Sequence, residues 1–169
     1  MPWVDFKNKI NVFPEEKKWR FVRSSNLYQR ALKCKKCDPN VSMSLLCSCS
    51  EALKLLGRSG GSRRNFKELY IRHCPTNLRT APMEYYPNLS TPHVATPFDK
   101  ALEYIYKRFR CPHIHEGIER LHNLKIRGIT IQIGSSLVDK LGNDGYAIDL
   151  LKILDWFFKI TLNSLYGML

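Results

Sequence analysis

Apolar side chains recur at helical spacing along most of the chain. Residues 14–33 offer Trp19, Val22, Leu27 and Ala31 for one face of a helix, and the segment opens with a proline followed by two glutamates. A proline with acidic residues after it is typical of a first helical turn. The pattern therefore predicts a helix from about residue 14 to residue 33.

Further helices are predicted where a residue that can cap a helix precedes apolar positions spaced three or four apart. For the second helix, Ser42 or Ser44 is the expected cap and Gly57 the end, and Ser62 is expected to cap the third. These predicted helices cover about residues 42–56, 62–73, 98–109 and 114–127, and a last one runs from Tyr146 to the end of the chain.

Three segments do not follow the helical period. Residues 1–13 have no period and are expected to form an extended arm. Residues 75–97 are rich in proline, with the last four prolines spaced five apart, and proline at this density excludes a helix or an interior strand. We expect an extended segment lying across another surface, with a disordered linker as the alternative. Residues 129–133 alternate apolar and polar side chains, which predicts a half-buried strand, the only clean strand in the chain.

The pattern as a whole predicts an α+β protein that is mainly α, with helices packed around one short strand region. We expect an extended arm (1–13), a basic helical region (14–74), a proline-rich extended segment (75–97) and a helix-strand-helix core with a C-terminal apolar helix (98–169). The polar stripe of the last helix is narrow, so this helix is expected to be the centre of the core or, less favoured, a protein contact. The stripe consists of Asp149, Lys152, Asp155, Lys159 and Asn163.

Positive charge is concentrated in the first three quarters of the chain. The 27 Lys and Arg exceed the 15 Asp and Glu by 12. Residues 1–127 hold 24 basic and 11 acidic residues, a balance of +13, whereas residues 128–169 hold 3 and 4, a balance of −1. A field of this sign attracts phosphate backbones and releases counterions on binding, which favours RNA as the partner.

The charge pattern predicts a non-catalytic RNA-binding structural component of a ribonucleoprotein assembly, by analogy with ribosomal and mitoribosomal proteins. Ribosomal RNA and neighbouring proteins of the assembly are the expected partners. Tyr28, Tyr85, Tyr86 and Tyr106 are candidates to stack on bases, although burial is the commoner fate of tyrosine. The expected phosphate contacts are Lys17, Lys18, Arg20, Arg23, Lys35, Lys36, Arg58, Arg63, Arg64, Lys107, Arg108 and Arg110.

Four cysteines within sixteen residues form a candidate zinc site. The ligands would be Cys34, Cys37, Cys47 and Cys49. Two close pairs of thiols suit a tetrahedral zinc ion. The second pair is C-x-C and falls inside a predicted helix, where alternate residues face different ways, so helix and zinc site exclude each other. Isolated thiols are the alternative.

Two other classes of function remain open. The first is an accessory subunit of a large complex, either at a membrane or away from one, that docks through its C-terminal helix. The second is a metal-dependent nuclease, because His113 and His115 resemble the His-x-His pair of HUH single-strand endonucleases, with Tyr146 as the nearest downstream nucleophile. Helical periodicity after His115 would splay that pair.

Residues 159–167 resemble a motif of family B DNA polymerases. Lys159, Asn163, Ser164, Tyr166 and Gly167 match the pattern K-x-x-x-N-S-x-Y-G, which in that family lies on a fingers helix whose lysine meets the incoming triphosphate. The resemblance covers nine residues. Residues 86–89 faintly resemble the first metal-binding motif of that family, but they lack its aspartate. Nucleotidyl transfer needs two carboxylates for the metal pair, so we interpret the match as a chance feature of a core helix.

The sequence also bears on location. It has no apolar segment long enough for a membrane span, no apolar signal core at its start, and acidic residues that are unusual in a transit peptide. Six cysteines without a secretion signal favour a reducing compartment. We expect an intracellular protein, cytoplasmic or, after processing, mitochondrial.

Overall fold

Helices make up most of the fold. The computed structural model describes residues 2–53, 62–89, 92–110, 130–133, 136–141 and 143–169. The helices are α1 (Pro2–Ile10), α2 (Glu15–Cys34), α3 (Pro39–Ala52), α4 (Ser62–His73), η1 (Thr76–Leu78), α5 (Phe98–Ile105), the π-helical turn η2 (Tyr106–Arg110) and α7 (Leu150–Tyr166). The strands are β1 (Met83–Tyr86), β2 (Val94–Ala95), β3 (Thr130–Ile133), β4 (Ser136–Leu141) and β5 (Asp144–Ile148).

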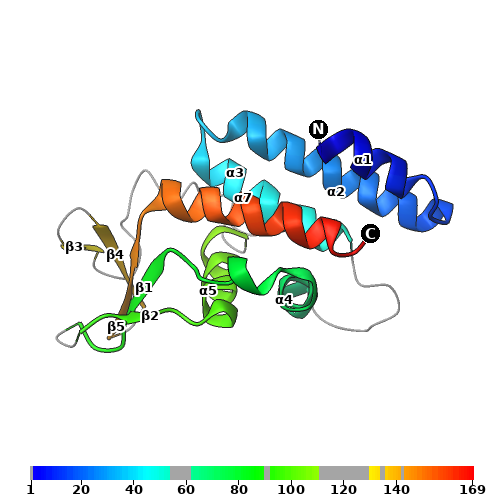
Figure 1. The fold of residues 1–169 in the computed structure, drawn as a ribbon. Coiled ribbons are helices and arrows are strands. Elements are labelled where there is room, and N and C mark those ends of the chain that lie inside the picture. The colour runs from blue at the N-terminus through cyan, green and yellow to red at the C-terminus, as the bar shows by residue number, and fades with distance from the viewer. Residues whose placement is uncertain (1, 54–61, 90–91, 111–129, 134–135, 142) are drawn as a thin grey trace.

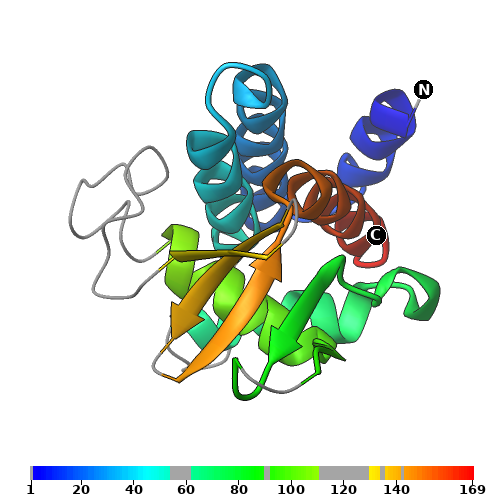
Figure 2. The same ribbon diagram turned by 90° about the vertical axis from the view of Figure 1, so that its left-hand side faces the viewer.

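The predicted fold class, α+β and mainly α, is confirmed. Helix α7 runs through the middle of the molecule, with α2 and α3 on one side and α4 and α5 on the other (Figure 1). The sheet lies at one end of this helical body rather than at its centre (Figure 2).

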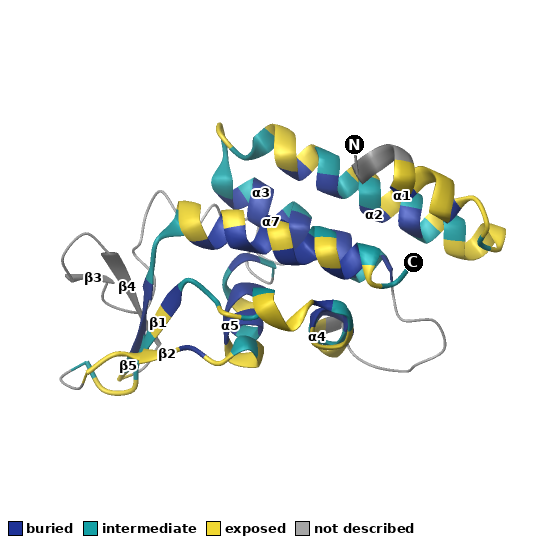
Figure 3. Ribbon diagram, in the orientation of Figure 1, coloured by how far each residue is buried: buried dark blue, intermediate teal, exposed yellow. Residues whose placement is uncertain are grey.

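Helix α7 is the centre of the core, as predicted. Most of its surface is buried, and the exposed positions are Leu151 and the predicted stripe from Lys152 to Asn163 (Figure 3). The expected start at Tyr146 is wrong, because that residue belongs to β5. The helix starts at Leu150, where the Asp149 carboxylate accepts hydrogen bonds from two backbone N–H groups.

Helices α2 and α3 form an antiparallel pair held by small polar side chains. The buried Ser24 hydroxyl donates to the carbonyl of Cys49 at 2.8 Å. Helix α3 begins at Pro39 because the Asp38 side chain caps it, so the expected cap at Ser42 or Ser44 is wrong. Both serines donate instead to carbonyls of other helices.

The N-terminal segment is not the extended arm that we expected. Residues 2–10 form α1, and the fully buried Phe6 packs edge-on against Phe21 and Tyr166. The lysines between the apolar residues made the helical period of α1 hard to recognise in the sequence. Within this amphipathic helix, Asp5 and Lys9 pair at 3.4 Å.

The proline-rich segment contains an interior strand, contrary to our expectation. The sheet order is β2-β1-β5-β4-β3, and β1 pairs on both sides with antiparallel neighbours. Pro82 and Pro87 flank β1 instead of interrupting it, so every residue of the strand keeps its N–H group. The predicted strand near residues 129–133 is confirmed as β3. The predicted helix over 114–127 lies outside the described residues.

Candidate nucleic-acid interface

The outer face of α2 carries a row of cations. Between Lys17 and Cys37 the chain has eight basic residues and no acidic one. The buried residues of the helix are Phe21, Ser24, Tyr28 and Ala31. On the opposite side lie the exposed residues Trp19, Arg23, Asn26, Arg30 and Lys33, which follow one another at intervals of three or four. We call these five residues the α2 outer face.

A groove runs along this face beside a tryptophan. It has a volume of about 580 Å³ and is lined by Trp19, Arg20, Arg23, Asn26, Leu27 and Arg30 of α2 and by Ala52 of α3. We call it the Trp19 groove. The Trp19 side chain is 66% exposed, so the prediction that it belongs to the core face of the helix is wrong.

The three cations of the α2 outer face, Arg23, Arg30 and Lys33, have no carboxylate close by in the described part of the chain. Among the residues that the structure describes, no Asp or Glu oxygen lies within 4.0 Å of Arg23, Arg30 or Lys33. Arg20, at the edge of the groove, donates to Glu16 at 2.8 Å. Lys17 lies over the Phe13 ring, and Lys18 is 4.0 Å from Glu15. Lys36 is exposed in the turn after the helix.

A second group of cations lies on α4 and η2, on the other side of α7. The Glu103 carboxylate is contacted by Lys107 at 2.9 Å, by Lys67 at 3.6 Å and by Arg63. Glu68 is shared by Arg64 at 3.4 Å and Arg72 at 3.7 Å. Five cations thus share two carboxylates, so this cluster keeps a positive surplus while its charges are partly compensated.

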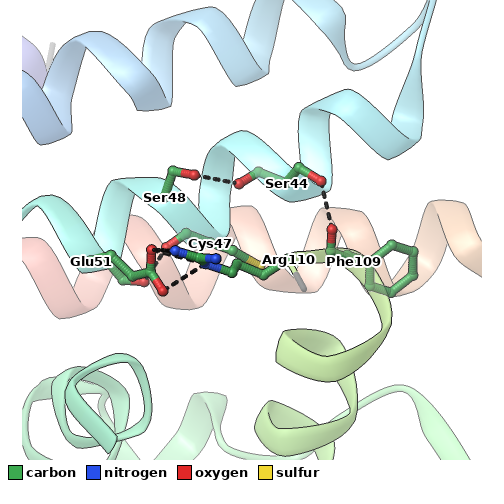
Figure 4. A network of polar contacts seen from close by, with 7 residues as sticks. Ser44, Cys47, Ser48, Glu51, Phe109 and Arg110 are labelled. Atoms are coloured by element: carbon green, nitrogen blue, oxygen red, sulfur yellow. Dashed lines mark hydrogen bonds and ion pairs between the residues drawn. The ribbon is translucent and has the colours of Figure 1, made fainter. Parts of the chain in front are cut away.

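Two further predicted phosphate contacts, Arg110 and Lys35, pair with carboxylates of other elements. Arg110 at the end of η2 holds the Glu51 carboxylate of α3 with its Nε at 2.9 and 3.0 Å and its Nη2 at 2.9 Å (Figure 4). Lys35 pairs with Asp155 of α7 and lies over the Phe158 ring. Arg108 is half-buried, and Arg58 lies outside the described residues. Arg110, Lys35 and Arg108 are therefore less available to RNA than the α2 outer face.

The four cysteines of the candidate zinc site are spread over two helices and their connection. Cys47 and Cys49 are buried within α3, whereas Cys37 is exposed. Burial raises the pKa of Cys49 to about 12, so its thiol is neutral at physiological pH. Within the described part of the chain, no three His, Cys, Asp or Glu side chains are grouped as metal ligands. The zinc site stays a prediction.

The candidate stacking tyrosines are all at least half-buried. Tyr28 and Tyr106 belong to the core. Burial raises the pKa of Tyr28 to about 12. The Tyr85 hydroxyl donates to Asp144 at 2.7 Å, and this hydrogen bond raises its pKa to about 12. Sequence reasoning did not propose Trp19 for this role, although its position opposite Tyr28 and Ala31 on the helix would have indicated it.

The residues behind the two enzyme resemblances are only partly described. His113 and His115 lie outside the described residues, and Tyr146 is buried in β5 against Tyr104. Of the polymerase-like motif, Lys159 and Asn163 are exposed on α7, whereas Ser164 is buried.

None of the helices in the described ranges is both long enough and apolar enough to cross a membrane. Comparisons with protein-family models, with curated proteins and with solved structures give no match.

Proposed function

We propose that the protein binds RNA through the α2 outer face, as a non-catalytic component of a ribonucleoprotein assembly of the ribosomal or mitoribosomal type. The observation that carries the proposal is the row of Arg23, Arg30 and Lys33, exposed on one helix face with no described carboxylate within 4.0 Å. Ribosomal RNA is the proposed partner.

The energetics of this row favour a polyanionic partner. Arg30 and Lys33 are three residues apart, and like charges at that spacing destabilise a helix by about 0.2–0.5 kcal/mol. A phosphate backbone removes this repulsion and gains from releasing its own counterions. Guanidinium groups also bind phosphate oxygens in bidentate geometry. The partly compensated cluster around Glu103 is available for weaker contacts to the same RNA.

The burial of the C-terminal helix favours RNA binding over the alternative of docking through that helix. Nine residues of α7 are buried in the core of the same chain, including Trp156, Phe157 and Phe158. Presenting these nine residues to a partner would require the core to open.

The test is the affinity of the purified protein for an end-labelled oligouridine, measured by fluorescence anisotropy between about 50 and about 200 mM salt. The variant Arg23→Ala/Arg30→Ala should bind roughly tenfold more weakly. The slope of log K against log salt should fall in magnitude by about 1.4, because each lost phosphate contact on a single strand removes about 0.7.

The matched control is Arg64→Ala/Arg72→Ala, which removes the same charge from two arginines that share Glu68. It should change affinity less than about threefold, in line with the screening of net charge alone. Absence of oligouridine binding by the wild-type protein, or equal losses in the two double variants, would refute the proposal.

A further inference from the structure

We infer that the Trp19 groove holds an unpaired RNA base, which stacks on the indole of Trp19 while neighbouring phosphates meet Arg23 and Arg30. The inference rests on the proposed function and adds the form of RNA that the site selects.

The exposure of Trp19 is the first support. A tryptophan that is 66% exposed leaves a large flat apolar surface in water beside an open groove. The same protein buries Trp156 to 8% exposure and satisfies its indole N–H with the Leu78 carbonyl at 2.8 Å. Trp19 therefore has an unused stacking surface, whereas Trp156 has a structural role.

The placement of the arginines is the second support. Arg23 and Arg30 follow Trp19 on the same helix face, and at about 1.5 Å per residue they lie about 6 Å and about 16 Å further along the axis. Asn26 lies between them, and its amide can both donate and accept at a base edge. Proteins that bind single strands combine aromatic platforms for bases with cations along the backbone.

A duplex would make poor use of this groove. Its bases are stacked on one another, so only backbone contacts to the arginines would remain. An acidic peptide would pair with the arginines, but it brings no flat ring at a fixed distance from each negative charge. Every nucleotide supplies both, which is why the groove fits unpaired RNA better than an acidic protein.

The experiment compares oligouridine with an RNA duplex of equal length for the wild type, Trp19→Ala and Trp19→Phe. Trp19→Ala should weaken oligouridine binding about tenfold, the effect of losing one base–aromatic stack, and should leave duplex binding within about twofold because the duplex contacts the arginines alone. Trp19→Phe should keep most of the affinity. Wild-type tryptophan fluorescence should fall on binding, and this quenching should be lost in Trp19→Phe.

The matched control is Leu151→Ala. It shortens an exposed apolar side chain on a different helix, α7, and should leave the affinities for oligouridine and for the duplex unchanged. If oligouridine binds through Arg23 and Arg30 but Trp19→Ala has no effect, the inference is overturned and the proposed function stands. If the wild type binds neither RNA, both are overturned. Trp19-dependent binding of poly-glutamate as tight as that of oligouridine would overturn the inference in favour of an acidic protein partner.

Discussion

The ion pair between Arg110 and Glu51 should be a strongly coupled contact of this fold. Its side chains are only 13% and 16% exposed, and three N···O distances between 2.9 and 3.0 Å join η2 to α3. Removing one partner of a buried pair costs about 3–5 kcal/mol, and an exposed pair contributes about 0.2–1 kcal/mol. For this intermediate burial we expect Glu51→Leu to lower the free energy of unfolding by about 2–3 kcal/mol.

The double variant Glu51→Leu/Arg110→Met should be no less stable than either single variant, because it leaves no unpaired charge. Urea unfolding followed by tryptophan fluorescence gives the free energies of unfolding of the wild type, the two single variants and the double variant. From this double-mutant cycle we expect a coupling energy between Glu51 and Arg110 of about 1.5–2.5 kcal/mol. The exposed pair Asp5–Lys9 is the control, with an expected coupling of about 0.3–0.5 kcal/mol. Additivity within about 0.5 kcal/mol at Glu51 and Arg110 would refute the reasoning.

Three shorter predictions test other parts of the structure. Phe6→Ala should lower the free energy of unfolding by about 3–4 kcal/mol, since Phe6 is fully buried; a change below about 1 kcal/mol would mean that α1 does not dock. Because Tyr28 and Cys49 have pKa values raised to about 12 from 10.0 and 9.0, the folded state holds their protons more tightly. Their contribution to stability is therefore complete below pH 9.0 and falls as pH rises towards 12, which unfolding at a series of alkaline pH values would measure, with a smaller fall in Tyr28→Phe. In native alkylation Cys37 should react quickly and Cys49 slowly; protection of Cys37 and Cys34 that a chelator removes would instead support the predicted zinc site.

The sequence was sufficient to locate α2 but not to identify its buried face. Helical spacing indicated the helix, yet the apolar residues selected for the core included Trp19, which is exposed. The actual core face includes Ser24, whose hydroxyl is satisfied by the Cys49 carbonyl of a helix 25 residues away. A polar side chain such as that of Ser24 can be buried at low cost only when another element supplies its hydrogen-bond partner. The local sequence around Ser24 does not show that such a partner is present.

The interior position of β1 was also beyond local reasoning. Its four residues lie between two prolines that indicated a segment without regular structure. The strand forms because β5, about sixty residues later, supplies the ladder partners from Gly145 to Ile148. Long-range pairing can therefore override a local signal, provided that the prolines fall just outside the paired residues.

The positive charge of the chain divides into two groups when contacts are considered. Arg110, Lys35 and Arg63 each pair with a carboxylate of another element, so they join helices to one another. Arg23 and Arg30 extend from a helix stretch without acidic residues and border a groove that contains an exposed aromatic ring. The charge pattern predicted phosphate contacts for four of these five residues, all except Arg30, without separating the two groups. Because a cation already paired within the fold gains less from a phosphate than an unpaired one, binding should depend on the second group far more than on the first.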